Sequence, residues 1–138
     1  MDNSIKDEIK KKYSKIVISG NDDCCCMPGE CDSGDSPIDA TKLIGYNQKE
    51  LESIPQEAIL GVGCGAPINH TQLKEGETVV DLGSGAGIDI FLAARKVLDS
   101  GRAIGIDMTD DMLQKARENA KKGSYPNVEF KKGDIEEN

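Results

Sequence analysis

The stretch that most constrains the fold of this chain is VVDLGSGAG, which spans residues 79–87. A short apolar run meets an acidic residue, Asp81, and then three glycines, Gly83, Gly85 and Gly87, each two residues from the next. Glycine adopts left-handed backbone conformations and lets a backbone approach a ligand closely. The pattern therefore predicts a strand that runs into a tight loop, with a tight turn at Gly83, close approach to a ligand at Gly85 and helix packing at Gly87.

The second half of the chain alternates between strand-like and helix-like patterns. This order implies right-handed crossovers and a parallel sheet, so we expect an α/β, Rossmann-like fold. The expected strands are residues 78–82, 103–106 and 128–131. The face of one expected helix is marked by Ile88, Phe91, Leu92 and Leu98, and that helix ends at Gly101. A second helix begins after an N-cap at Thr109, buries Met112, Leu113, Ala116 and Ala120, and ends at Gly123.

The first half of the chain carries weaker signals. Residues 4–15 predict an amphipathic helix, because Ile5, Ile9 and Tyr13 repeat every four residues. Residues 19–39 are rich in Gly, Asp, Ser, Pro and Cys, which is typical of a loop or a disordered arm.

Two short helices are expected next. Asn47 is placed to cap one through Leu51, and Ser53 with Gln56 forms a capping-box pattern that opens another over residues 55–60. We therefore divide the chain into an N-terminal helix with a Cys-rich arm, residues 1–45, and a partial ligand-binding domain, residues 46–138.

Composition narrows the classes of function. The formal net charge of the 138 residues is −8, which argues against a nucleic-acid groove. No apolar run approaches the roughly 18 residues of a membrane span, and the N-terminus has no signal-peptide pattern. We expect a cytoplasmic protein that contacts neither nucleic acid nor membrane, with mostly reduced cysteines. The lysines near the start are expected on a solvated helix face: Lys6, Lys10, Lys11, Lys12 and Lys15.

Acidic residues lie at or just after the ends of all three expected strands. Asp107 ends the second strand about 20 residues past the glycine loop, where it can accept hydrogen bonds from ribose hydroxyls. Asp134 follows the third strand, so both should share one edge of the sheet with Asp81. Together they suit a ligand with an amino group, a ribose and a base, and no phosphate. The spacing is G-x-G-x-G, not the G-x-G-x-x-G of dinucleotide sites, and no P-loop Lys-Ser/Thr follows.

This stretch resembles motif I of the class I S-adenosylmethionine-dependent methyltransferases. The resemblance implies that the loop backbone holds the methionyl part of the cofactor and that Asp107 binds the ribose. It also implies that Asp134 and Ile135 recognise the adenine, and that Asp81 shapes the loop and meets the methionyl end. The candidate cofactor-binding residues are Asp81, Gly83, Ser84, Gly85, Gly87, Asp107, Met108, Asp134 and Ile135.

The five cysteines suggest a second kind of chemistry. They are Cys24, Cys25, Cys26 and Cys31 in DDCCCMPGEC, and Cys64 in GVGCGAP. Thiolates select soft, thiophilic ions, but the spacing lacks the C-x-x-C pairs of a zinc site. His70, the only histidine, is expected at the surface or at a helix cap. Two other interpretations stay open: an arm with incidental thiols, and a small buried residue at position 64.

Longer stretches resemble the arsenite S-adenosylmethionine methyltransferases. The segments are IPQEA, GCGAP and DLGSGAGIDIFLAAR, followed by GIDMTDDMLQKARENA and NVEFKKGDIEE, within residues 13–138. The resemblance implies that As(III) is bound by thiolates and attacks the sulfonium methyl group, and that a thiol reductant takes part. Cys64 matches a family cysteine that handles arsenic, and one of Cys24, Cys25 and Cys26 matches the N-terminal one.

The resemblance also implies a seven-stranded sheet and further cysteines downstream. We therefore expect this chain to be an N-terminal portion, with strand 78–82 unpaired on one edge and with no catalysis by itself. Two alternatives remain: a methyltransferase acting on another small molecule, and a non-enzymatic, thiol-based metalloid-binding module.

Overall fold

The computed structural model describes residues 3–19, 36–63 and 65–136. In chain order its regular elements are α1 (Asn3–Ser19), α2 (Pro37–Leu43), α3 (Gln48–Glu52), the 3₁₀ turns η1 (Gln56–Ala58) and η2 (Pro67–His70), β1 (Thr78–Leu82), α4 (Ile88–Val97), β2 (Arg102–Asp107), α5 (Asp110–Gly123) and β3 (Val128–Lys132).

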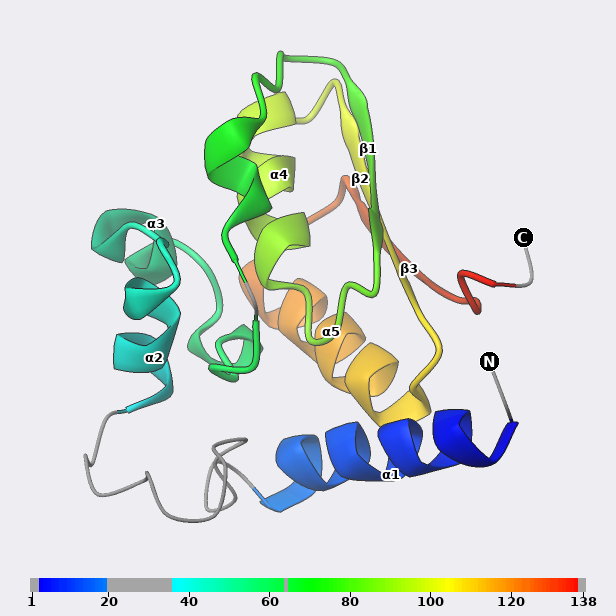
Figure 1. Cartoon of the computed structure of the whole chain (residues 1–138). Coiled ribbons are helices and arrows are strands. Elements are labelled where there is room, and N and C mark those ends of the chain that lie inside the picture. The colour runs from blue at the N-terminus through cyan, green and yellow to red at the C-terminus, as the bar shows by residue number, and fades with distance from the viewer. Residues whose placement is uncertain (1–2, 20–35, 64, 137–138) are drawn as a thin grey trace.

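The three strands form one parallel sheet, as the sequence predicts, and their order in the sheet is β1-β2-β3. Thr78 pairs with Arg102 and Ala103 with Val128, so the carboxyl ends of the strands lie at one edge. Helices α4 and α5 lie on the same face of this sheet (Figure 1). Among the described residues β1 pairs on one side only, and Val80 and Leu82 are 52% and 56% exposed. The expected unpaired apolar edge is thus present.

Three aromatic rings join the helices to the sheet. The Phe91 ring lies 4.8 Å from that of Tyr125 and 5.9 Å from that of Phe130, measured between centroids. Phe91 is fully buried, and a side-chain carbon on Gly105 of β2 would lie 2.6 Å from Phe130. The core is therefore packed tightly between α4 and the sheet, close to the glycine loop.

Helix α4 ends earlier than predicted. It stops at Val97, and Leu98 has a φ of 57° and is 48% exposed, so the expected end at Gly101 and the placement of Leu98 on the apolar face are both wrong. The Asn127 side-chain amide donates to the carbonyls of Ala94 and Leu98 at 3.1 and 2.8 Å. These bonds satisfy carbonyls at the helix end and fix the early turn.

The first half of the chain departs most from the predictions. Helix α2 begins at Pro37, within the expected loop, with Ser36 as its N-cap. The prediction of a capping box at Ser53 and Gln56 is wrong. The Ser53 hydroxyl donates to the Glu50 carbonyl, and the Gln56 amide donates to the carbonyls of Leu51 and Ile54. Both side chains therefore close the end of α3, and only a 3₁₀ turn follows.

The buried face of α1 is also rotated from the expected one. Ile5 is 48% exposed, whereas Lys6 and Ile16 are buried, and the helix runs four residues past Lys15 to Ser19. Helix α1 packs against α5 (Figure 1). Lys6 is thus not on a solvated face, although Lys11, Lys12 and Lys15 are exposed as expected.

Candidate functional site

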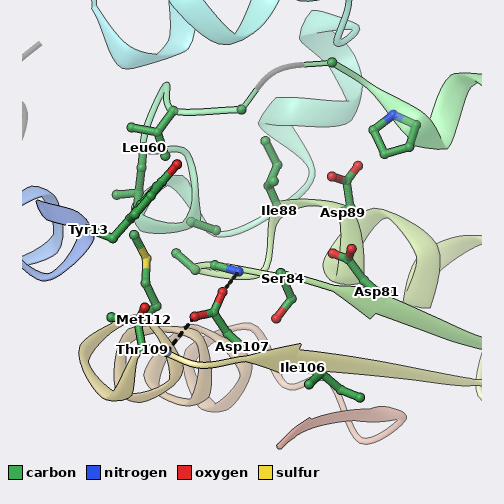
Figure 2. Close-up of a pocket in the computed structure, with 18 of the residues that line it drawn as sticks. Tyr13, Leu60, Asp81, Ser84, Ile88, Asp89, Ile106, Asp107, Thr109 and Met112 are labelled. Atoms are coloured by element: carbon green, nitrogen blue, oxygen red, sulfur yellow. Dashed lines mark hydrogen bonds between the residues drawn. The ribbon is translucent and has the colours of Figure 1, made fainter. Parts of the chain in front are cut away.

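A cavity of about 720 Å³ opens at the carboxyl ends of the three strands. Its wall includes the glycine loop after β1, the end of β2, the segment that follows β3, the start of α5, Ala58, residues 60–63 and 65–67, and two side chains of α1 (Figure 2). Ligands of parallel α/β sheets bind at this edge, and the volume lies within the usual range of small-molecule sites. The cavity is therefore the candidate site.

The glycine loop combines a packed glycine with two open ones. Gly83, Gly85 and Gly87 have φ values of 82°, 53° and 99°, in the region that favours glycine. A side-chain carbon on Gly87 would lie 2.8 Å from Phe130 and 2.9 Å from Phe91, so Gly87 has the packing role predicted for it. Such a carbon on Gly83 would meet nothing within 4 Å, and on Gly85 only the Met112 sulfur at 3.9 Å. The loop therefore leaves space beside its backbone at the two positions that line the cavity.

Asp107 holds the loop to the end of β2. Its carboxylate accepts hydrogen bonds from the backbone N–H of Gly85 at 2.9 Å and of Thr109 at 2.8 Å (Figure 2). The N–H groups of Gly83 and Ser84 both donate to the Ile106 carbonyl. Thr109 precedes α5 as expected, but its side chain makes no capping hydrogen bond. Asp107 therefore organises the loop, a role that the sequence does not predict.

Two carboxylates lie on one side of the cavity in Figure 2, Asp81 from β1 and Asp89 from α4. The Tyr46 hydroxyl donates to Asp89 Oδ2 at 2.8 Å, and Asp89 Oδ1 has no hydrogen-bond partner among the described residues. Burial raises the pKa of Asp89 to about 6, with a smaller contribution from the Asp81 charge. Burial also raises the pKa of Asp81, and the Asp107 charge adds to this.

No pattern in the sequence singles out Tyr46 or Asp89. An acidic residue in the first turn of a helix is ordinary, because it interacts favourably with the helix dipole. Tyr46 lies 43 residues before its partner, so no local pattern links the two.

Asp134, which follows β3, also lines the cavity. Lys6 Nζ donates to Asp134 Oδ2 at 2.6 Å and lies 2.9 Å from Glu136 Oε2. Asp134 Oδ1 accepts from the Glu136 N–H at 3.0 Å. The Lys6 hydrogen bond lowers the pKa of Asp134, and the pKa of Lys6 is raised by its bonds to Asp134 and Glu136. Met108 and Ile135 also line the cavity.

The cysteines cannot be placed in this site. Cys24, Cys25, Cys26, Cys31 and Cys64 all lie outside the described residues, so their assignment to As(III) stays a prediction. Gly63 and Gly65, which flank position 64, line the cavity. Within the described ranges no cluster of three or more His, Cys, Asp or Glu side chains suits a metal ion, and His70 is exposed, as expected.

These residues suit S-adenosylmethionine. The two open glycines leave room beside backbone N–H groups, and the carboxylates offer acceptors for amino and hydroxyl groups. No lysine or arginine among the described residues lines the cavity, as a phosphate would need. Separately, no described helix is long and apolar enough to span a bilayer.

The chain is similar to known methyltransferases. A methyltransferase domain family model matches residues 73–138. The chain is 41% identical over 94% of its length to an arsenite methyltransferase of Halobacterium salinarum, and 39% identical over 72% to a 23S rRNA (uracil(1939)-C(5))-methyltransferase of Acinetobacter baylyi. It covers 35% and 19% of those proteins.

Among solved structures, an arsenic(III) S-adenosylmethionine methyltransferase of Chlamydomonas reinhardtii is similar to this chain, with 27% identity and a TM-score of 0.45. The match covers 75% of this chain and 34% of the Chlamydomonas chain. The matched arsenite methyltransferase is similar to nearly the whole chain, and the family model covers the sheet and its glycine loop. The chain therefore has a Rossmann-like fold and resembles the S-adenosylmethionine-dependent methyltransferases, in particular the N-terminal part of an arsenite methyltransferase.

Proposed function

We propose that this chain supplies the cofactor site of an enzyme that transfers a methyl group from S-adenosylmethionine to thiolate-bound As(III). The observation that carries the proposal is the 41% identity to an arsenite methyltransferase over 94% of the chain. The chain spans about a third of that relative's length, so residues outside this sequence belong to the proposed enzyme.

In this proposal the backbone of residues 83–87 holds the methionyl part of the cofactor, and Asp81 meets its amino group. Asp107 accepts from the ribose while it keeps its bonds to the Gly85 and Thr109 N–H groups. Each carboxylate oxygen accepts more than one hydrogen bond, so both roles are compatible. Met108, Asp134 and Ile135 contact the adenine. The bound cofactor supplies an electrophilic methyl group on a sulfonium.

For the acceptor, Cys64 and one or more of Cys24, Cys25 and Cys26 bind As(III). Because the arsenic lone pair is the nucleophile, no general base is needed at the arsenic atom, and alignment with water exclusion supplies much of the acceleration. A thiol reductant takes part. Gly63 and Gly65 line the cavity, whereas Cys64 lies outside the described residues, so its proposed role rests on the resemblance. We keep the division of the chain into an N-terminal helix with a Cys-rich arm, residues 1–45, and a partial cofactor-binding domain, residues 46–138.

The test is calorimetry on the full chain with S-adenosylhomocysteine, arsenite, and both together, followed by a methylation assay of the longer enzyme. We expect each ligand to bind and methylarsenicals to form, and we expect no turnover by the 138-residue chain alone. Arsenite binding without any response to S-adenosylhomocysteine would instead support a metalloid-binding module. Methylation of another small molecule, or of RNA, with no arsenite turnover would refute the assignment of the acceptor.

A further inference from the structure

One face of α1 borders the cavity at the carboxyl ends of the strands. Lys6, Ile9, Tyr13 and Ile16 share this face because they recur at three- and four-residue spacing. Ile9 and Tyr13 line the cavity, Ile16 is buried, and the helix packs against α5. The first residue, Lys6, and the third, Tyr13, are separated by two turns, or about 10 Å along the helix axis. The face is therefore long enough to cover the adenosyl end of a ligand.

Lys6 is unusual for a lysine on a surface helix. It is 9% exposed, and its ammonium group contacts both Asp134 and Glu136, which follow β3 in the sequence. Lysine is rarely buried unless it is paired, and a charged hydrogen bond of 2.6 Å fixes both partners. The contact therefore fixes the orientation of the Asp134 carboxylate and holds α1 against the rim of the cavity.

Tyr13 provides an aromatic surface in the same wall. Figure 2 shows its side chain reaching from α1 into the cavity toward Leu60, with Met112 of α5 on the same side of the view. Tyr13 is 37% exposed and faces the cavity, so its ring is available to a ligand. Tyr13 and Tyr46 are the aromatic residues in this wall among those that the structure describes, and the Tyr46 hydroxyl is bonded to Asp89.

We propose that α1 completes the cofactor site: Tyr13 contacts the adenosyl group, and Lys6 is a positioning residue that orients Asp134 toward the adenine amino group. The inference rests on the proposed function, because it assumes that S-adenosylmethionine occupies this cavity. It adds a helix far from the glycine loop in sequence to the set of residues that bind the cofactor. An adenosyl ligand then binds between α1 and the strand ends.

The test measures the affinity of the full chain for S-adenosylhomocysteine and for its inosyl analogue, in which the adenine amino group is replaced by a carbonyl oxygen. The variants are Lys6→Met, Lys6→Arg and Tyr13→Leu, with Lys12→Met as the matched control, because Lys12 is an exposed lysine of the same helix. Circular dichroism of each variant checks that the helices are retained. Tyrosine fluorescence is a second readout, since the chain has three Tyr and no Trp.

We expect Lys6→Met to weaken binding of S-adenosylhomocysteine about tenfold and to reduce the preference for it over the inosyl analogue. Lys6→Arg should restore most of the affinity, and Lys12→Met should bind as the wild type does. Tyr13→Leu should weaken binding of both ligands about tenfold and remove most of the fluorescence change on binding.

Wild-type affinity in both Lys6→Met and Tyr13→Leu would overturn the inference and leave the proposed function standing. An equal loss for both ligands in Lys6→Met would overturn the positioning role of Lys6. No binding of S-adenosylhomocysteine by the wild-type chain would refute the proposed function, and the inference with it.

Discussion

Replacing Gly87 by alanine should destabilise the fold more than the same change anywhere else in the glycine loop. The added carbon would lie 2.8 Å from Phe130 and 2.9 Å from Phe91, at a φ of 99°. Neither ring can turn away, because Phe91 is fully buried and the two centroids are only 5.9 Å apart. Overpacking costs about 1–3 kcal/mol and the left-handed backbone about 1–2 kcal/mol, so we expect a loss of about 2–5 kcal/mol. Urea unfolding followed by circular dichroism measures this loss.

Gly83→Ala is the matched control, because Gly83 has a similar φ of 82° but open space where its side chain would be. This variant should lose only the backbone contribution, about 1–2 kcal/mol, and should weaken binding of S-adenosylhomocysteine in calorimetry because the new methyl group occupies the cavity wall. Equal losses of stability in the two variants would refute the argument that packing against the rings, rather than backbone conformation, fixes glycine at position 87.

Three further predictions concern other parts of the fold. The pKa of Asp89 is about 6 in the folded chain and about 4 when unfolded, so the folded state binds the proton more tightly and the contribution of Asp89 to stability falls as pH rises from 4 to 6. Asp89→Asn leaves an acceptor for Tyr46 and should flatten that part of the pH profile of stability in urea unfolding. An unchanged profile would contradict the assignment of this pH dependence to Asp89. Asn127→Ala removes both bonds to the end of α4 and should cost about 1–2 kcal/mol in the same assay, whereas no change would mean that Leu98 keeps its turn without them. Leu82→Lys should reduce self-association of the chain in sedimentation, since it places a charge on the exposed edge strand, and undiminished association would locate the contact elsewhere.

The strands and the site edge were predictable because their signals are local. A run such as residues 78–82 is apolar, short and followed at once by glycines, and the structure has a strand with the same bounds. Once the sheet is parallel, the residues that follow the strands must meet at one edge, and Asp81, Asp107 and Asp134 all line the same cavity. The roles of these residues toward the cofactor are still predictions.

The features that sequence reasoning missed depend on partners far along the chain. The burial of Lys6 depends on Asp134, 128 residues later, and without that carboxylate a lysine is best placed in solvent. Leu98 fits the apolar stripe of α4 by its spacing. However, the side chain of Asn127, 29 residues later, donates a hydrogen bond to the Leu98 carbonyl, and the helix ends before Leu98. Periodicity predicts from local sequence which face of a helix is buried, but it cannot predict which distant side chain will contact that face.

The charge of the cavity wall explains why one class of adenosine ligand suits this site better than another. Asp81, Asp89, Asp107 and Asp134 line the cavity, and no lysine or arginine among the described residues does. A phosphate about 4 Å from one ionised carboxylate would be repelled by about 4 kcal/mol at an effective dielectric constant near 20, so dinucleotides and nucleoside phosphates are disfavoured. A ligand with a sulfonium and an ammonium group is attracted by the same field. Because the glycine loop alone would admit either class of ligand, the carboxylates around it provide the discrimination. Lys6 reduces the repulsion among these carboxylates because it pairs with Asp134.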